Sequence, residues 1–458
     1  MRIIIVGCGK VGATIVEQLS DEGHDIVVVD INSKKIEAIT TAYDVMGFVG
    51  NGTSYKVLKE AGIEDTELLI AVTDSDEQNL LTCLIAKKAG NCSTIARVRD
   101  PELNEDIDFI AEELGLSMTV NPEKAAAVEI ARLLRFPAAV QIDTFARDEV
   151  ELLKFVIPAN SQLAGRVLSE VGRIQEDVLI CCVERGQDVI IPDGSFILEA
   201  GDKVSIASSS AGARDFFRRI GIESHPVKNV LIVGGGKIGV YLCQELSENG
   251  VGLKIIEQNY ERCRELCEQL PGVVVIHGDG TDESVLREEG IEKADAFVSL
   301  TGIDEENIFL SMFARKCSHA KVVTKIDRIS FNDVINQLHL GSMIYPKKII
   351  ADHIIRYVRA MNNASGSSEI ETLHELIEGR VEAVSFNIGP KSSIIDIPLQ
   401  KLKIIHEALI VCIRRENNEV IIPNGHSEIR SGDTIVVVTS KRGVNDINDI
   451  LEKEEVRA

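Results

Sequence analysis

Two glycine-rich loops are the parts of this chain best suited to bind a ligand. Gly7–Gly12 reads G-x-G-x-x-G and directly follows the apolar run Ile3–Val6. The same pattern returns 227 residues later, where Gly234–Gly239 follows Val230–Val233. Glycines at this spacing allow a tight turn, close approach of the backbone to a pyrophosphate and close packing of the next helix. The free N–H groups at the start of that helix favour an anion, so each loop predicts a dinucleotide-binding site.

An acidic residue follows each glycine loop at the distance that such sites use. Asp30 closes a second apolar run, and Glu257 occupies the same position in the second half, each 23 residues after the first glycine of its loop. A carboxylate at this point accepts hydrogen bonds from the adenosine ribose hydroxyls. Its charge repels a 2′-phosphate, which favours NAD(H) over NADP(H) as the cofactor of the first half.

Later loops supply further candidates, because ligands of parallel sheets lie over the carboxyl ends of the strands. Several of these positions change in the second half, where Gly302 replaces Asp74, so ATP, ADP or AMP is an alternative ligand there. Arg97 is placed to reach a phosphate or a partner carboxylate. The predicted cofactor-binding residues are Gly7, Cys8, Gly9, Lys10, Val11, Gly12, Asp30, Asn51, Gly52, Thr73, Asp74 and Arg97, and in the second half Gly234, Gly235, Gly236, Lys237, Ile238, Gly239, Glu257, Asp279, Thr301 and Lys325.

Strands and helices alternate around the first loop, which predicts an α/β fold with a doubly wound, Rossmann-like parallel sheet. Helix Ser33–Thr41 is expected to begin with Ser33 as its N-cap. The strands are expected at Ile3–Val6, Asp25–Asp30, Met46–Val49, Leu68–Val72, Thr94–Val98 and Met118–Val120.

A smaller α+β unit is expected to follow the sheet. Its predicted strands are Glu149–Ile157, Asp177–Val183, Asp188–Ile191 and Lys203–Ala207. The whole arrangement then recurs, which indicates a tandem duplication of a two-domain unit. The expected domains are residues 1–122, 137–221, 227–346 and 369–453, with the Asn-, Ser- and Gly-rich segment 362–368 as a flexible linker.

Two amphipathic helices, Glu123–Arg135 and Lys347–Arg359, follow the two sheets. Their apolar faces have no obvious partner in the sequence. Either they pack within their own domain, or they pack on a neighbouring copy and build a dimer or a tetrameric ring whose shape a nucleotide controls.

Composition excludes several classes of function. The chain has 49 basic and 72 acidic residues, a net charge of −23, 4% aromatic residues and no Trp. This balance argues against binding to nucleic acid or anionic membranes. No apolar run is long enough to cross a bilayer and no signal peptide is recognisable, so we expect a cytoplasmic protein. The ten cysteines are expected to be reduced and the nine histidines show no metal-ligand spacing. Cys8 is the exception, since its position at a helix N-terminus predicts a lowered pKa.

An NAD-dependent oxidoreductase is the alternative function. Tyr55 and Lys59 have the spacing of an oxidoreductase Tyr/Lys pair, but the second half does not repeat them. The sequence shows no Ser/His/Asp order, no paired-carboxylate pattern and no G-x-x-x-x-G-K-[ST] motif. We therefore predict a regulator without catalytic residues. The acidic residues Glu149, Glu151 and Asp202 raise the separate question of whether the small domains bind an ion.

In combination, these motifs resemble the RCK (KTN) family of potassium-conductance regulators. The resembling stretches are Gly7–Gly12, Asp30, Ala71–Glu77, Ile95–Arg99, Gly234–Gly239, Glu257 and the Gly-Asp turns at Gly201 and Gly432. The resemblance implies two RCK units in one chain, NAD(H) in the Rossmann-like domains and adenine nucleotides as competing ligands. It also implies a homo-oligomeric ring on the cytoplasmic face of the inner membrane, bound to a membrane-embedded Trk-type potassium transporter subunit that it gates.

Overall fold

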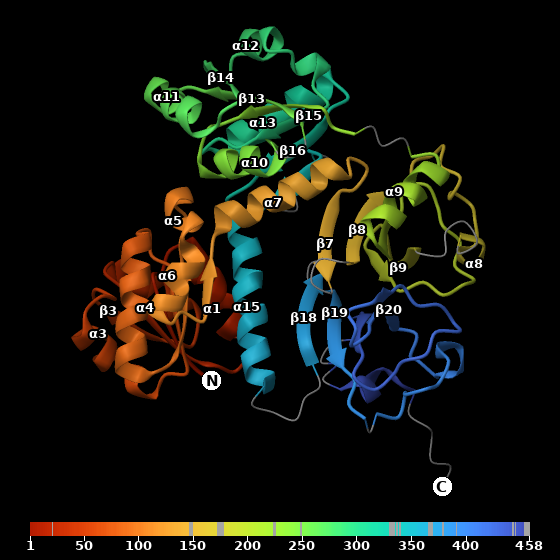
Figure 1. The fold of residues 1–458 in the computed structure, drawn as a ribbon, viewed down its shortest axis with the longest axis horizontal. Helices are drawn as coiled ribbons and strands as arrows, with labels where there is room; N and C mark the ends of the chain where they lie inside the picture. Colours follow the sequence, from red (N-terminus) through yellow and green to blue (C-terminus); the bar gives the residue numbers. More distant parts are fainter. Residues whose placement is uncertain are drawn as a thin grey trace. The chain divides into compact units, whose positions relative to one another are not determined.

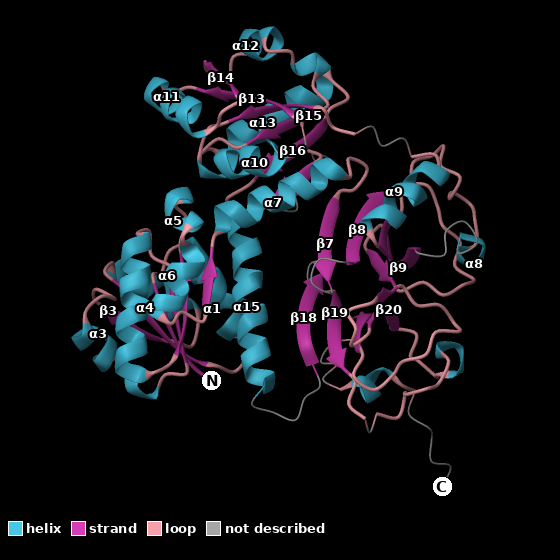
Figure 2. Ribbon diagram, viewed as in Figure 1, coloured by secondary structure: helices cyan, strands magenta, loops and turns pink. Residues whose placement is uncertain are grey.

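The apolar run after the N-terminus forms the central strand of a parallel sheet. Ile3, Ile4 and Ile5 are fully buried, as expected for a strand covered on both faces. The sheet has the order β3-β2-β1-β4-β5-β6 and its strands lie among helices (Figure 2). These strands, all predicted, are β1 (Arg2–Val6), β2 (Asp25–Asp30), β3 (Met46–Val49), β4 (Leu68–Ala71), β5 (Ser93–Arg97) and β6 (Met118–Val120).

The computed structural model describes residues 1–20, 22–145, 150–171, 178–222, 226–247, 250–328, 335, 338, 340–364, 370–377, 380–390, 392–441, 444 and 446–452. Within these ranges the chain divides into two units (Figure 1). The first contains Met1–Ala131 and Val227–Tyr357, and the second contains Arg132–Pro226 and Val358–Ala458.

The helices around the first sheet begin and end at recognisable signals. At α4 the Ser75 side chain accepts a hydrogen bond from the N–H of Gln78, and Asn91 closes the helix in the left-handed conformation. At α2 the predicted cap is wrong by one residue: Asn32, not Ser33, has the extended backbone of an N-cap and accepts from the N–H of Lys34. The helices are α1 (Lys10–Ser20), α2 (Ser33–Ala42), α3 (Tyr55–Glu60), α4 (Asp76–Gly90), α5 (Pro101–Glu105) and α6 (Ile107–Leu114).

The second half of the chain repeats this sheet in the order β14-β13-β12-β15-β16-β17. Its strands are β12 (Asn229–Val233), β13 (Gly252–Glu257), β14 (Val274–His277), β15 (Ala296–Ser299), β16 (Lys321–Lys325) and β17 (Ser342–Ile344). Its helices are α10 (Lys237–Ser247), α11 (Tyr260–Gln269), α12 (Glu283–Glu288) and α13 (Asp304–Cys317). The carboxyl ends of parallel strands again meet at one edge of the sheet.

Two long helices, α7 (Pro122–Arg135) and α15 (Pro346–Ala364), leave the two sheets. Figure 1 shows α7 running along the second parallel sheet and α15 along the first. At their starts, the Asn121 amide donates to the Tyr241 hydroxyl of α10 at 2.9 Å, and Lys347 lies beside Lys10 of α1.

Their apolar faces are buried within the single chain, including Ala127 and Ile130 on α7 and Ile350 and Ile354 on α15. Of the two alternatives, burial of these faces within one chain supports internal packing and does not require a neighbouring copy. The expected linker also begins too early, since residues 362–364 are still helical and 365–368 lie outside the described residues.

The second unit consists of two antiparallel sheets with the orders β10-β9-β11-β8-β7 and β18-β19-β22-β20-β21. Leu152 and Cys182 of one sheet share an apolar core with Ala383, Val411 and Val436 of the other. β7 and its counterpart β18 were not predicted. The strands are β7 (Gln141–Phe145), β8 (Val150–Val156), β9 (Val178–Arg185), β10 (Asp188–Ile190), β11 (Lys203–Ser208), β18 (Ile370–Leu376), β19 (Val381–Asn387), β20 (Ala408–Arg414), β21 (Val420–Ile421) and β22 (Thr434–Thr439), and the helices are α8 (Leu168–Val171) and α9 (Ser210–Arg219).

Candidate nucleotide-binding sites

The three glycines of the first loop meet three different surroundings. Gly7 has φ +103°, and a Cβ there would lie 2.8 Å from the Thr73 nitrogen. A Cβ on Gly12 would lie 2.0 Å from the carbonyl oxygen of Gly7, whereas one on Gly9 would meet nothing within 4 Å. The outer glycines are thus required by the packing of the loop on β4 and α1. The middle glycine leaves open space in which a ligand can approach the backbone.

The second loop repeats this arrangement. Gly234 has φ +106°, with a hypothetical Cβ 2.8 Å from the Leu300 carbonyl carbon, while Gly236 is open to 4 Å. Gly235 replaces Cys8, and a Cβ there would lie 2.4 Å from a methyl group of Leu266. Both loops therefore have an open surface at the N-terminus of a helix, where N–H groups and the helix dipole favour an anion.

The acidic residues predicted to bind ribose are tied to their own loops. One oxygen of Asp30 accepts from the Cys8 N–H at 2.7 Å and the other from the Asn32 N–H at 2.8 Å. Glu257 makes the same two contacts with the N–H groups of Gly235 and Asn259, both at 2.8 Å. Each carboxylate oxygen has further lone pairs, so the acid remains able to accept from a ligand.

Cys8 does not behave as its position suggested. Burial, together with the negative charge of Asp30, raises the pKa of the thiol to about 12. The helix N-terminus is outweighed by these two effects, so Cys8 is an unreactive buried residue whose N–H anchors Asp30. All ten cysteines lie in the described part of the chain, and no disulfide joins any two of them.

Thr73 and Arg97 are held by an amide that we did not single out as a site residue. The fully buried Asn79 accepts from the Thr73 N–H at 2.8 Å and donates to the Arg97 carbonyl at 2.9 Å. Asn307 makes the same bridge between Thr301 and Lys325. Both halves share the stretch Asp-Glu-x-Asn, at residues 76–79 and 304–307, and this repetition was the sequence signal that could have identified the two asparagines.

The guanidinium of Arg97 is directed at its own half. It donates to the Thr73 carbonyl and lies 3.1 Å from Asp74, whose side chain is 93% exposed. Burial and the charge of Arg99 lower the pKa of Arg97. Arg97 therefore pairs with a carboxylate of its own half, and its contact with a phosphate stays a prediction.

Asn51 and Asp279 organise the loops after β3 and β14. Each accepts from the N–H and hydroxyl of the threonine two residues on, Thr53 or Thr281. A Cβ on Gly52 would lie 2.2 Å from the Val6 side chain, so a glycine is needed for the loop to approach β1 this closely.

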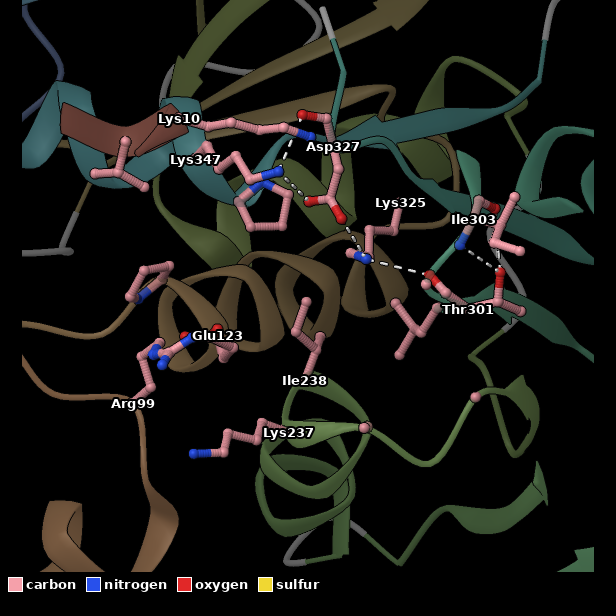
Figure 3. Close-up of a pocket in the computed structure, with 18 of the residues that line it drawn as sticks. Lys10, Arg99, Glu123, Lys237, Ile238, Thr301, Ile303, Lys325, Asp327 and Lys347 are labelled. Carbon is pink, nitrogen blue, oxygen red and sulfur yellow. Dashed lines mark hydrogen bonds and ion pairs between the residues drawn. The ribbon is translucent and has the colours of Figure 1, made fainter. Parts of the chain in front are cut away.

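A cavity of about 1090 Å³ lies between the two Rossmann-like halves of the first unit (Figure 3). It joins the predicted residues Cys8, Gly9, Lys10, Val11, Asp74 and Arg97 to Gly234, Gly236, Lys237, Ile238, Gly239, Glu257, Asp279, Thr301 and Lys325. Gly7, Gly12, Asp30, Asn51, Gly52, Thr73 and Gly235 are not part of its lining. Arg99, Glu123, Asp327 and Lys347 also line it and were not predicted.

The four additional residues sit where the halves meet. Arg99 follows β5 and Glu123 begins α7, while Asp327 and Lys347 are their counterparts after β16 and on α15. Burial raises the pKa of Glu123 although the nearby Arg99, Arg97 and Lys237 lower it. Sequence spacing within one half could not reveal this cavity, because it forms only when the halves pack together.

The oxidoreductase-like pair lies elsewhere. Tyr55 and Lys59 are on α3, Tyr55 is 49% exposed, and neither residue lines the cavity. Lys59 pairs with Glu64 at 3.1 Å. The spacing of Tyr55 and Lys59 is therefore that of two residues on a surface helix.

The acidic residues of the second unit have internal partners. Asp202 accepts two hydrogen bonds of 2.8 Å from Arg185, and the equivalent Asp433 accepts one hydrogen bond from Arg415. Glu151 accepts from the Ser210 hydroxyl at 2.7 Å, and Glu149 lies outside the described residues. Among the residues that the structure describes, no three His, Cys, Asp or Glu side chains form a group that could hold a metal ion.

Comparison with known proteins identifies both kinds of domain. The TrkA-N domain model matches residues 3–122 and 230–346, and the TrkA-C domain model matches residues 152–221 and 383–452. The Trk system potassium uptake protein TrkA of Vibrio alginolyticus is 30% identical over 458 residues, which cover 99% of both chains.

Solved structures show the same fold. The GsuK RCK domain superimposes with a TM-score of 0.64 at 19% identity, covering 95% of this chain and 92% of that one. The GsuK channel bound to NAD gives 0.62 at 18% identity, covering 96% of this chain and 76% of the channel. Among the described helices, none has both the length and the apolar character needed to cross a membrane.

Proposed function

The chain belongs to the TrkA family, and we propose that it is a nucleotide-sensing regulatory subunit that gates a Trk-type potassium transporter. It carries two copies of each TrkA domain, and its curated relatives are potassium uptake proteins matched over nearly their whole length. We propose no catalytic role, because the family is regulatory and because Arg97, Lys237 and Lys325 at the cavity are engaged in ion pairs.

The observation that carries the nucleotide assignment is the contrast among the loop glycines. Gly7 and Gly12 have no room for a side chain, whereas Gly9 is open toward the cavity. Asp30 anchors the loop by accepting a hydrogen bond from the Cys8 N–H. This combination is what a dinucleotide pyrophosphate and its adenosine ribose require. We propose NAD(H) as the ligand of the first half; the NAD-bound GsuK channel of the same fold supports this choice.

The packing of the two halves supports a role in regulation. The cavity is lined by both glycine loops and by the starts of α7 and α15, so a ligand in it contacts elements of both halves. Occupancy by NAD(H), ATP or ADP would therefore favour one relative arrangement of the halves over another. Such a change is the signal that we propose the transporter subunit receives at the cytoplasmic face of the membrane.

The test is co-purification of the full chain with a Trk-type membrane subunit, followed by potassium flux measurements in vesicles with and without NADH and ATP. We expect the complex to form and its flux to depend on the nucleotide. A chain that binds neither nucleotide nor the membrane subunit would contradict the proposal. Sustained oxidation of NADH by the purified chain with carbonyl substrates would instead favour the oxidoreductase alternative.

A further inference from the structure

The two Rossmann-like halves are joined differently at the two ends of the cavity between them. At the end formed by α7 and α10, a buried tyrosine of the second half makes the joint. The hydroxyl of Tyr241, a residue only 4% exposed, accepts from the Asn121 side-chain amide at 2.9 Å and donates to the Arg99 carbonyl at 3.2 Å. Both partners belong to the first half. One hydroxyl thus binds the segment after β5 and the start of α7 to the opposite half.

The two segments that this hydroxyl contacts are held firmly in the first half. Asp76, at the start of α4, accepts from the N–H groups of Arg99 and Asp100 at 2.8 and 2.9 Å. The side-chain oxygen of Asn121 accepts from the Lys124 N–H at 2.9 Å and so caps α7. A movement of α10 away from these fixed segments would leave a buried hydroxyl without its partners, which is unfavourable.

At the other end of the cavity, formed by α1 and α15, the repeat does not reproduce this tyrosine. Thr14 of α1 occupies the position that Tyr241 has on α10. Its hydroxyl donates to the carbonyl of Lys10, in the same helix, at 3.0 Å. A hydrogen bond between the halves is thus replaced at this position by one within a single helix.

The charges that meet across the halves at this end are of like sign. Lys10 of the first half extends toward Lys347 and Asp327 of the second (Figure 3). Burial lowers the pKa of the Lys347 ammonium and the charge of Lys10 lowers it further, while Asp327 raises it. Asp327 lies 3.3 Å from the Lys347 ammonium but also pairs with Lys325 at 2.8 Å, so one carboxylate serves several ammonium groups. Separation of Lys10 from Lys347 therefore reduces a repulsion.

We propose that Tyr241 is the pivot of the two halves, so that the cavity opens and closes between Lys10 and Lys347 while the Tyr241 end stays joined. Opening at the pivot would break buried hydrogen bonds and the ion pair between Lys237 and Asp100, whereas opening at the opposite end relieves like charges. This inference rests on the proposed nucleotide-sensing function and specifies where its change of arrangement takes place.

Four exposed positions outside the cavity lining allow both ends to be measured in the full chain. Lys124 on α7 and Gln244 on α10 flank the pivot, and Lys348 on α15 and Glu17 on α1 are the equivalent positions of the repeat at the other end. Spin labels are attached to each pair through an introduced non-native amino acid, so that the ten native cysteines stay unmodified. On addition of NADH, the distance distribution measured by pulsed EPR is expected to shift for positions 17 and 348 and to keep its maximum for positions 124 and 244.

Tyr241→Phe keeps the ring and removes only the hydroxyl, so it should make the distance between positions 124 and 244 depend on NADH as well. Tyr55→Phe is the matched control, because it removes the hydroxyl of a half-exposed tyrosine on α3, and it should behave as the unmodified chain. Asn121→Ser retains an N-cap for α7 but loses the amide donor. It should act as Tyr241→Phe does, and serves if that variant does not fold.

Equal shifts at both ends of the unmodified chain, or pivot variants that cannot be distinguished from it, would overturn the inference and leave the proposed function intact. A chain that binds NADH in calorimetric titration and shifts at neither end would overturn the inference together with the rearrangement of the halves. If the unmodified chain did not bind NADH, the proposed function itself would be contradicted, and this inference with it.

Discussion

The Lys237 ammonium at the start of α10 lies 3.1 Å from the carboxylate of Asp100, a residue 137 positions earlier in the other Rossmann-like half. Near this ion pair the Tyr241 hydroxyl donates to the Arg99 carbonyl at 3.2 Å. Lys10 and Lys347 meet across the halves at the corresponding place in the repeat. The glycine loop of each half thus supplies a lysine to the opposite half.

The pair between Lys237 and Asp100 should contribute little to stability in spite of its good geometry. Both side chains are more than a third exposed, so solvent and salt screen the attraction. A double-mutant cycle with Lys237→Gln and Asp100→Asn is expected to give a coupling free energy of about 0.2–1 kcal/mol in urea unfolding of the full chain. A coupling of several kcal/mol would show that the two groups are desolvated.

The glycine loop can be tested by comparing two alanine substitutions. Gly12→Ala places a methyl group against the Gly7 carbonyl and should lower the free energy of unfolding by about 2 kcal/mol or more. Gly9→Ala meets open space and should leave the melting temperature nearly unchanged while it weakens NADH binding. Thermal unfolding and calorimetric titration of both variants separate these effects. Unchanged NADH affinity in Gly9→Ala would place the ligand elsewhere.

The sequence predicted the parallel sheets well because their signals are local. The apolar runs at β1 and β12 lead directly into glycine patterns, and the two copies support each other. β7 and β18 were missed because each is an edge strand without a long apolar run, and β7 contains Asp143. The N-cap of α2 was misplaced because Asn32 and Ser33 are both good caps and only backbone conformation distinguishes them.

The candidate site was predictable only as far as each half defines it. The loop glycines and the acids Asp30 and Glu257 have fixed spacings, so they could be found from one half alone. Glu123 and Lys347 become site residues only when the halves pack, which no local pattern encodes. Cys8 shows the converse error, since helix position suggested a low pKa but burial and Asp30 raise it to about 12.

Asp30→Ala should weaken NADH binding by about 1–3 kcal/mol, because the ribose loses a charged hydrogen-bond acceptor and the Cys8 N–H loses its partner. Calorimetric titration of the full chain measures the change. Asp25→Ala is the matched control: it removes the same charge from the exposed opposite end of β2 and should bind NADH normally. Equal affinities of the two variants would remove Asp30 from the site.

In the second unit, the buried carboxylate of Asp202 should make stability depend on pH at the acidic end. Burial alone would raise its pKa, but two hydrogen bonds from Arg185 and one from the Glu199 N–H hold it below the ordinary value of 3.8. A carboxyl group with a lowered pKa stabilises the fold fully above its unfolded pKa. That contribution is lost as the pH falls through the lower folded pKa.

Asp202→Asn should therefore destabilise the chain at pH 7 by about 1–3 kcal/mol, since the Arg185 guanidinium loses its charged acceptor. The difference from the unmodified chain should shrink below about pH 4, where the native carboxyl group also becomes protonated. Chemical unfolding followed between pH 3 and pH 7 measures both effects. The control is Asp193→Asn, which removes the carboxylate of an exposed turn in the same unit. A destabilisation that stays constant over this range would mean that the ion pair with Arg185 is not its cause.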